Sequence, residues 1–483
     1  MKTLTIVATI DRDVTRAALE AASVSAAWLE VRADLAGEID VARLRRHFGG
    51  KLLFTLRGRG EGGESHAGDR ERRARLISAA ERYDLIDLEP RDLVPRVLEA
   101  IAPERRVLST AHLDFVERLL ATPAALYRVA PLARKHADAL APLRLLKSLG
   151  RSDICAYADG PLGIWTRLVA PQLGSPAIFA PLDGDMSVAK LTLDYGFPEV
   201  TEAREIFAIA GDPVYSSLFP RVHNAAFRAI GRSALYVPFL VPAFRDFWLD
   251  LVESEALDDL GLPLRAICVV SPNKELAVGA ASERTPVVRR ACSTNFFVRR
   301  DGGWTADTTD PEGVMLALKD HGVKAANQKV AVVGCGGSGR AIATALQNAG
   351  ADVTLVNRGL DRGSFAVSLL HLPFMPLAGF SAGDYSIVVN ATPVGRSGGD
   401  PPFSPDRLRD DAVVIDLVYG DAPTLLVSKA RARGQTAIDG KEILLKHAVR
   451  QFLLMTGEEL PELLVRGVLG MEPERLPRAV AVR

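Results

Sequence analysis

Short apolar runs alternate with amphipathic stretches through the first 200 residues of the chain. The runs predict strands at Leu4–Ile10, Trp28–Arg32, Leu52–Leu56, Leu85–Leu88, Arg106–Ser109 and Ala177–Ala180. Helical patterns such as Glu71–Tyr83 and Asp138–Leu149 lie between them. Alternating strands and helices predict a parallel α/β sheet, and about 200 residues suit a (β/α)8-type barrel. Such barrels carry function at the carboxyl ends of their strands, where this sequence has Glu30, Arg32, Arg57, Glu89 and His112.

A new α/β pattern begins near residue 203. The apolar strand Glu205–Ala210 leads into a hydroxyl-rich turn, Gly211–Phe219, and then a helix. This order of elements can hold a small anion such as a carboxylate. Further on, the apolar run Ile267–Val270 ends at a proline, and Lys274 follows at the start of a predicted helix.

Residues 329–358 read as strand, glycine turn, helix and strand. The turn contains Gly334, Gly336, Gly337, Ser338 and Gly339. Glycines in this context let backbone amides approach a pyrophosphate at a helix N-terminus. The pattern therefore predicts a dinucleotide site, and a glycine-rich turn that binds nothing is the alternative.

The second strand of this unit ends in Asn357 and Arg358. NAD enzymes usually place an acidic residue there, on the ribose 2′-hydroxyl, whereas an arginine attracts a 2′-phosphate. NADP is the predicted cofactor, and a solvated surface arginine is the plainer interpretation of Arg358. Two further buried strands follow, and polar residues end each of them at 390–392 and 416–419.

Length and composition limit the remaining possibilities. The chain has 483 residues, which suggests roughly three domains. Fifty-nine basic residues balance 59 acidic ones, so no overall charge favours nucleic acid or an anionic membrane. The four cysteines are widely spaced, which argues against structural zinc and suits a reducing cytoplasm. The N-terminal residues read as a strand rather than a signal peptide, and no apolar run approaches the roughly 20 residues of a membrane span.

The N-terminal motifs resemble type I 3-dehydroquinate dehydratase. The segments that carry the resemblance are Leu29–Asp34, Phe54–Arg57 with Glu61–Gly63, Asp87–Glu89, Tyr127–Ala130, Gly163–Arg167 and Gly184–Ser187. The family is a (β/α)8 barrel in which a lysine forms a Schiff base with the substrate ketone. The resemblance implies a site at Glu30, Arg32, Arg57, His112 and Arg167, with Gly184–Ser187 as its closing loop.

Two positions depart from that family. Arg128 stands where the Schiff-base lysine is expected, and a guanidinium stays protonated and cannot attack a carbonyl. Asp185 stands where the closing loop normally has a glutamine. His112, in a stretched version of the family's histidine motif, is either a general acid/base or a leftover strand-end histidine. The resemblance therefore predicts a barrel that has lost its chemistry, with another lysine as the route by which activity could persist.

The remaining motifs resemble shikimate dehydrogenase. Ile267–Lys274 matches the segment that carries the family's catalytic lysine, and Ala306–Gly313 matches the run whose aspartate, here Asp310, pairs with it. A lysine held by a carboxylate can protonate a developing alkoxide. A surface ion pair is the plainer interpretation. The resemblance implies substrate contacts at Ser217, Thr294, Asn295, Tyr419 and His447, and cofactor contacts at Asn390, Ala391, Thr392, Leu417 and Gly440.

Three positions depart from this second family. Phe219 replaces the second of two carboxylate-binding serines, Val270 replaces a threonine, and His447 replaces a glutamine. Tyr215 or Ser216 could compensate for the missing serine.

Together the motifs predict an α/β chain with a barrel followed by a two-lobed dehydrogenase. We expect a barrel at 1–198, a substrate-binding lobe at 203–320, a Rossmann NADP lobe at 321–440 and returning helices at 441–470. The implied reaction is NADPH-dependent reduction of 3-dehydroshikimate to shikimate, without metal, nucleic acid or membrane. A quinate-type hydroxy-acid dehydrogenase and a silent NADP-binding scaffold are the alternatives.

Overall fold

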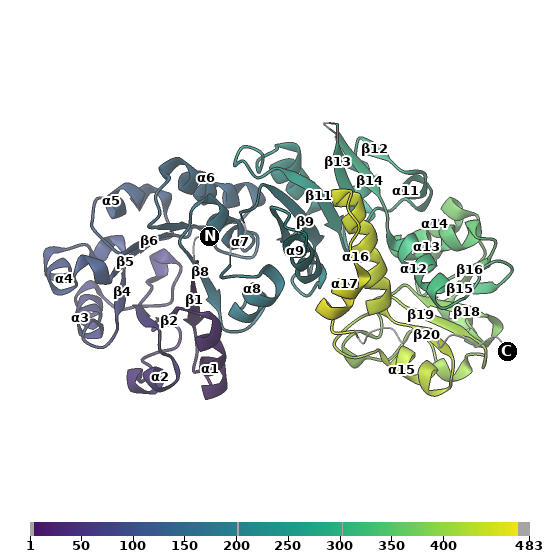
Figure 1. Cartoon of the computed structure of the whole chain (residues 1–483), viewed down its shortest axis with the longest axis horizontal. Helices are drawn as coiled ribbons and strands as arrows, with labels where there is room; N and C mark the ends of the chain where they lie inside the picture. The colour runs from purple at the N-terminus through teal and green to yellow at the C-terminus, as the bar shows by residue number, and fades with distance from the viewer. Residues whose placement is uncertain (1–3, 200–201, 302, 472–483) are drawn as a thin grey trace. The chain divides into compact units, whose positions relative to one another are not determined.

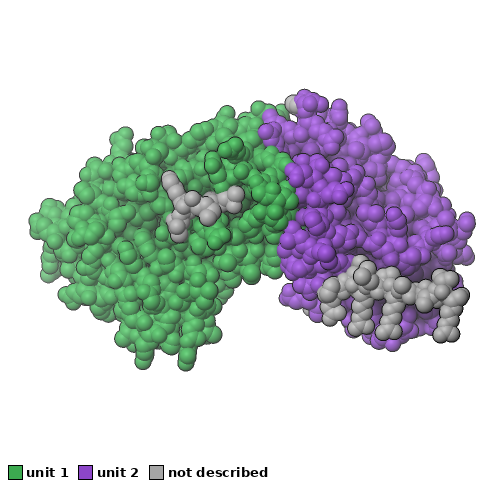
Figure 2. Space-filling view, in the orientation of Figure 1, with its two compact units in different colours: residues 1–208, 213–264 green, residues 209–212, 265–483 purple. Residues whose placement is uncertain are grey.

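The computed structural model describes residues 4–199, 202–301 and 303–471 of the chain. The first three residues of the predicted barrel, and Val200 at the predicted junction, lie outside the described residues. The chain forms two compact units, residues 1–208 with 213–264 and residues 209–212 with 265–483 (Figure 2). The predicted boundaries near 198, 320 and 440 remain predictions.

Eight parallel strands form the first sheet, in the order β7-β6-β5-β4-β3-β2-β1-β8. Their bounds are β1 Thr5–Ile10, β2 Trp28–Arg32, β3 Lys51–Thr55, β4 Leu85–Leu88, β5 Arg106–Thr110, β6 Leu126–Val129, β7 Ile154–Ala156 and β8 Ala177–Pro181. The two ends of this order meet, because Cys155 Sγ in β7 lies 3.4 Å from Ala177 O in β8. The sheet is therefore a nearly closed barrel, as the alternating pattern predicted.

Helices lie outside these strands (Figure 1). Their bounds are α1 Arg16–Ser25, α2 Val41–His47, α3 Asp69–Ala79, α4 Pro95–Ala100, α5 Val116–Leu120, α6 Leu140–Leu149, α7 Thr166–Val169 and α8 Val188–Tyr195. The two helices predicted from periodicity exist with shifted ends. The prediction began the second of them too early, because residues 136–139 form a 3-10 turn before α6.

The first unit continues past the barrel. Its later elements are β9 Glu205–Gly211, α9 Phe219–Ala229, β10 Ala234–Leu240, α10 Phe244–Phe247 and a π-helical turn Trp248–Glu253. Helix α9 packs on α8, where Asn224 Nδ2 donates to Asp194 O across 3.0 Å. The ring centroids of Trp165 and Phe239 lie 4.9 Å apart. The barrel and the segment after it thus share one apolar core.

The second unit begins with a mixed sheet. Residues 209–211, the end of β9, belong to this unit, and its further strands follow in the order β11-β13-β14-β12. The other bounds are β11 Leu264–Val269, β12 Glu283–Arg284, α11 Pro286–Ala291, β13 Phe296–Arg300, β14 Gly303–Asp307 and α12 Asp310–Asp320. The antiparallel hairpin of β13 and β14 brings Asn295, just before β13, beside the start of α12.

Six parallel strands form the last sheet, in the order β17-β16-β15-β18-β19-β20. The strands are β15 Lys329–Val333, β16 Asp352–Asn357, β17 Phe374–Pro376, β18 Ile387–Asn390, β19 Val413–Asp416 and β20 Thr436–Ile438. The helices are α13 Gly337–Asn348, α14 Leu360–Leu370, α15 Leu425–Ala432, α16 Gly440–Thr456 and α17 Glu462–Val468. This is the doubly wound dinucleotide-binding order, which binds its ligand where the order reverses, between β15 and β18. The predicted Rossmann lobe is confirmed.

Both faces of this sheet are covered. Val330 and Val332 pack into one apolar cluster, while Ala331 and Val333 pack into another on the opposite face. A parallel strand buried on both faces reads as a continuous apolar run, which is why 330–333 shows no polar alternation.

Candidate active site

Lys274 lies in the second unit, in the turn that follows β11. Its Nζ lies 2.7 Å from Asp310 Oδ2 and 3.1 Å from Asp310 Oδ1. It also donates to Ser338 Oγ across 2.9 Å. The prediction that a helix starts at Lys274 was wrong. The lysine lies in a turn, and a 3-10 helix follows at Leu276–Gly279.

Asp310 begins α12, where the positive end of the helix dipole favours a carboxylate. Burial alone would raise the pKa of Asp310, but the nearby charge and hydrogen bonds of Lys274 outweigh it and lower the pKa below its ordinary value. The carboxylate is therefore ionised and forms an ion pair with Lys274. The two side chains are 16% and 4% exposed, so this ion pair is not a solvated surface contact.

A set of amides and hydroxyls fixes the carboxylate. Asn295 Nδ2 donates to Asp310 Oδ1 across 2.9 Å, and Asn295 Oδ1 accepts from the backbone N–H of Thr309. Gln451 Nε2 donates to Thr309 Oγ1 across 3.1 Å. The Thr294 hydroxyl bonds the backbone carbonyl of Asp307. Gln451 was missed by the sequence reasoning, although it lies one helical turn after His447 on the same helix.

His447, on α16, lies next to the same carboxylate. Its Nε2 is 3.5 Å from Asp310 O and 3.9 Å from Asp310 Oδ1. A Cβ at Gly313 would overlap the imidazole, so this glycine makes room for it. Burial lowers the pKa of His447, Asp310 opposes that effect, and Lys274 adds to it, so the ring is held neutral. A neutral imidazole can both donate and accept a hydrogen bond.

A cavity of about 800 Å³ borders the glycine turn. Its lining includes predicted cofactor residues Gly334, Gly336, Gly337, Ser338, Asn357, Arg358, Ala391 and Thr392, and also Lys274. Two glycines of the turn have no room for a side chain: a Cβ at Gly337 would overlap Ser293 Oγ, and one at Gly339 would overlap the carbonyl of Gly334. Asn357 Oδ1 accepts from the backbone N–H of Cys335 and so braces the turn.

Two arginines border this cavity, the predicted Arg358 and the unpredicted Arg362 of α14. The glycine turn, the start of α13 and these two cations suit the pyrophosphate and the 2′-phosphate of NADP. Arg362 follows Arg358 by one helical turn, a spacing that could have marked it.

Other predicted cofactor and substrate residues have different surroundings. Asn390 is buried and donates to Asp416 Oδ1, while its oxygen accepts from Thr392, so it shapes the loop after β18. Tyr419 and Gly440 line a separate cavity of about 560 Å³. A Cβ at Gly440 would come within 2.9 Å of the carbonyl of Leu417.

In the first unit, Ser217 lies just before α9, where its Oγ accepts from Phe219 N across 3.3 Å. The hydroxyl of the neighbouring Tyr215 donates to Pro161 O across 3.0 Å. The tyrosine hydroxyl is therefore already engaged with the barrel.

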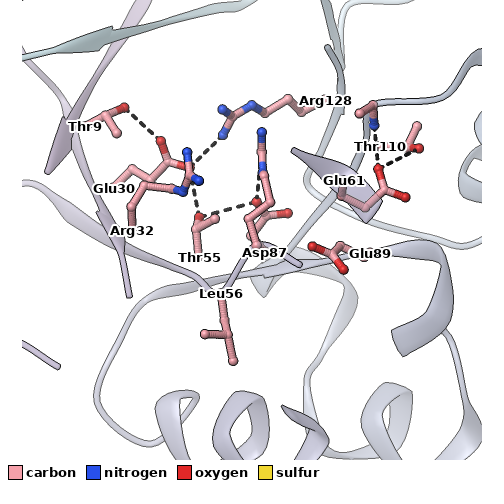
Figure 3. A network of polar contacts seen from close by, with 12 residues as sticks. Thr9, Glu30, Arg32, Thr55, Leu56, Glu61, Asp87, Glu89, Thr110 and Arg128 are labelled. Atoms are coloured by element: carbon pink, nitrogen blue, oxygen red, sulfur yellow. Dashed lines mark hydrogen bonds and ion pairs between the residues drawn. The ribbon is translucent and has the colours of Figure 1, made fainter. Parts of the chain in front are cut away.

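The barrel interior contains a buried ion pair between Glu30 of β2 and Arg128 of β6 (Figure 3). Arg128 Nη1 lies 2.6 Å from Glu30 Oε1, and its Nε donates to Tyr157 Oη. Thr9 and Thr55 donate to the two oxygens of the same carboxylate. Burial alone would raise the pKa of Glu30, but Arg128, Arg57 and Arg32 outweigh it and lower the pKa to about 2.

The other predicted barrel residues have partners of their own. Arg32 binds Asp34, Arg57 Nη2 lies 3.7 Å from Asp87 Oδ2, and Arg167 pairs with Asp159. His112 Nε2 contacts Gly60 O at a different cavity, of about 310 Å³, at the rim. The structure gathers Glu30, Arg57 and Arg128 in one network and places His112 elsewhere.

Comparisons with known proteins follow the same division of the chain. Residues 4–212 match the family model for type I 3-dehydroquinase. The shikimate dehydrogenase (NADP(+)) of Methanothrix thermoacetophila is 36% identical over 280 residues, 55% of this chain and 98% of that protein. The chloroplastic bifunctional 3-dehydroquinate dehydratase/shikimate dehydrogenase of Arabidopsis thaliana is 27% identical over 454 residues, 85% of this chain and 74% of that protein.

A solved structure extends the likeness. Shikimate 5-dehydrogenase from Thermus thermophilus, in complex with NADP(H) and shikimate, is 27% identical, with a TM-score of 0.50 over 55% of this chain and 98% of that one. Within residues 4–199, 202–301 and 303–471, no helix is long and apolar enough to cross a membrane.

Proposed function

The chain belongs to the shikimate dehydrogenase family, and from this premise we propose that it reduces 3-dehydroshikimate to shikimate with NADPH. The barrel that precedes this part in the sequence matches the type I 3-dehydroquinase family. The observation that carries the proposal is the Lys274–Asp310 pair, which borders the glycine-turn cavity through Ser338.

The proton-transfer step follows from this geometry. Bound NADPH would supply the hydride to the carbonyl carbon. Lys274 then gives a proton to the carbonyl oxygen as negative charge develops on it, so ketone, hydride and proton become the alcohol. Asp310 holds the Lys274 side chain in place by an ion pair, and Asn295 and Gln451 with Thr309 fix the carboxylate.

The remaining site residues are assigned as parts of the same proposal. Ser217 would bind the substrate carboxylate, and Asn295, Thr294 and His447 would contact its hydroxyls. The substrate contact of Tyr419, which lines the separate cavity, stays a prediction. Arg358, with Arg362 beside it, would select the 2′-phosphate. Asn390, Leu417 and Gly440 would shape the cofactor site through the loops that they hold.

We propose that the barrel performs no Schiff-base chemistry. Arg128 occupies the interior with its charge paired to Glu30, and its guanidinium is buried beside Tyr157 and Phe179. A guanidinium in this position cannot act as the neutral nucleophile.

A related hydroxy acid such as quinate is the second candidate. Three substitutions favour it. Phe219 and Val270 replace the hydroxyl groups of a serine and a threonine with apolar side chains, and His447 replaces the amide of a glutamine with an imidazole. We also propose the cytoplasm as the compartment, which the four free cysteines support.

The test is a steady-state assay of the full chain with shikimate and with quinate, each with NADP and with NAD. The proposal expects the highest kcat/KM for shikimate with NADP. A preference for quinate would replace the substrate, and the absence of turnover with either acid would favour a silent NADP-binding scaffold.

A further inference from the structure

The turn that carries Ser217 contacts the barrel at two points within the first unit. Lys190 Nζ, in α8, donates to the carbonyl of Tyr215 across 2.8 Å. The Tyr215 hydroxyl donates to Pro161 O, in the loop after β7, across 3.0 Å. Tyr215 is therefore bonded through both its backbone and its side chain, two residues before Ser217.

Helix α8 also holds the helix that follows the turn. Arg221 Nε lies 2.7 Å from Asp194 Oδ1, and Asn224 Nδ2 donates to Asp194 O. Lys190 and Asp194 are four residues apart, so they face the same side of α8. One helix of the barrel thus holds both the turn and the start of α9.

The surroundings of Tyr215 are charged barrel residues. Burial raises the pKa of its hydroxyl well above its usual range, Asp185 of the loop before α8 raises it further, and Arg167 opposes the effect. The hydroxyl therefore stays protonated at neutral pH and remains a hydrogen-bond donor to Pro161 O.

We infer that α8 and the Pro161 loop hold the Val214–Phe219 turn in its substrate-binding shape, with Tyr215 and Lys190 as positioning residues. The inference rests on the proposed role of Ser217 in binding the substrate carboxylate. The barrel would then support substrate binding by the dehydrogenase, whether or not it has dehydratase activity.

The test uses full-length Tyr215→Phe and Lys190→Met, each of which removes one contact. Lys147→Met is the matched control, because Lys147 Nζ donates to Asp259 O and joins the barrel to the same following segment away from the turn. Lys190→Arg keeps a charged donor and is the conservative rescue.

We expect the first two variants to raise the KM for shikimate about three- to tenfold, as for one lost hydrogen bond. The kcat and the KM for NADP should stay within about twofold, since the lost interaction is uniform binding. Lys147→Met and Lys190→Arg should behave as the unmodified chain.

Amide hydrogen exchange of residues 213–219 gives a second readout that needs no turnover. Exchange there should be faster in Tyr215→Phe and Lys190→Met and unchanged in Lys147→Met. Unchanged exchange in both variants would overturn the inference, as would faster exchange with an unaltered KM for shikimate. If the unmodified chain turns over no shikimate, the proposed function fails, and exchange alone decides whether the barrel orders the turn.

Discussion

Lys274 Nζ donates to Ser338 Oγ across 2.9 Å, which joins the proposed proton donor to the glycine turn. Ser338 is the second residue of α13, and a dinucleotide phosphate would be held by the same turn. The Ser338 side chain therefore links Lys274, the proposed proton donor, to the cavity at the glycine turn.

Removing the lysine should abolish most of the chemistry. Lys274→Ala is expected to lower kcat by about 10²–10⁴-fold, the range for a lost general acid. NADPH binding, followed by fluorescence, should persist, because the glycine turn and both arginines remain. Lys429→Ala, an exposed lysine of α15, is the control and should keep full activity. An undiminished kcat in Lys274→Ala would remove this residue from the mechanism.

Cofactor choice should depend on the two arginines at the cavity. Arg358→Ala is expected to raise the KM for NADP about ten- to a hundredfold, the loss of a charge-assisted hydrogen bond. Its KM for NAD should change little, because NAD has no 2′-phosphate. Arg362→Ala should show the same selectivity with a smaller effect. Arg409→Ala, whose exposed side chain pairs with Asp411, serves as the control. Equal losses for NADP and NAD would place these cations on the shared pyrophosphate instead.

The buried pair in the barrel should make stability depend on acid pH. The pKa of Glu30 falls from about 4.5 to about 2 on folding, so the unfolded chain binds the proton more tightly. The stabilisation, about 3 kcal/mol, is fully present above the unfolded value and is lost as the pH falls from about 4.5 to 2. Glu30→Gln should lower the urea midpoint at pH 7, and the difference from the unmodified chain should shrink below pH 4. A difference that is constant with pH would contradict this.

Schiff-base trapping should fail in the barrel. Treatment with dehydroquinate and borohydride is expected to leave the mass of the full chain unchanged. Arg128→Lys should also stay unlabelled near neutral pH, because the Glu30 carboxylate would keep the new amine protonated. A dehydroquinate adduct on the unmodified chain would reveal another reactive lysine. An adduct found only on Arg128→Lys would show that the barrel lacks nothing but this lysine for Schiff-base formation.

Local patterns predicted many of the elements, although the helix expected at Lys274 is a turn. The apolar run at 330–333 and the glycines after it form a strand and a turn as expected, since both depend on neighbouring residues. The motif resemblance also singled out Lys274 and Asp310, which the structure brings within 2.7 Å.

Contacts between distant segments were harder to anticipate. Gln451 meets Thr309 across 142 residues, and Lys190 meets Tyr215 across two predicted domains. Neither has a local signal, because packing of helices decides which side chains meet. His112 was left between a general acid/base and a leftover strand-end histidine. Its ring contacts the Gly60 carbonyl, and its role stays a prediction.

The joint where Trp165 meets Phe239 has a practical consequence for anyone dissecting the gene. Cutting the chain near residue 200 would expose an apolar surface on each fragment, and such a surface promotes aggregation. Activity measured on the fragments would then reflect their aggregation rather than the role of the missing part. Point substitutions in the intact polypeptide avoid this problem.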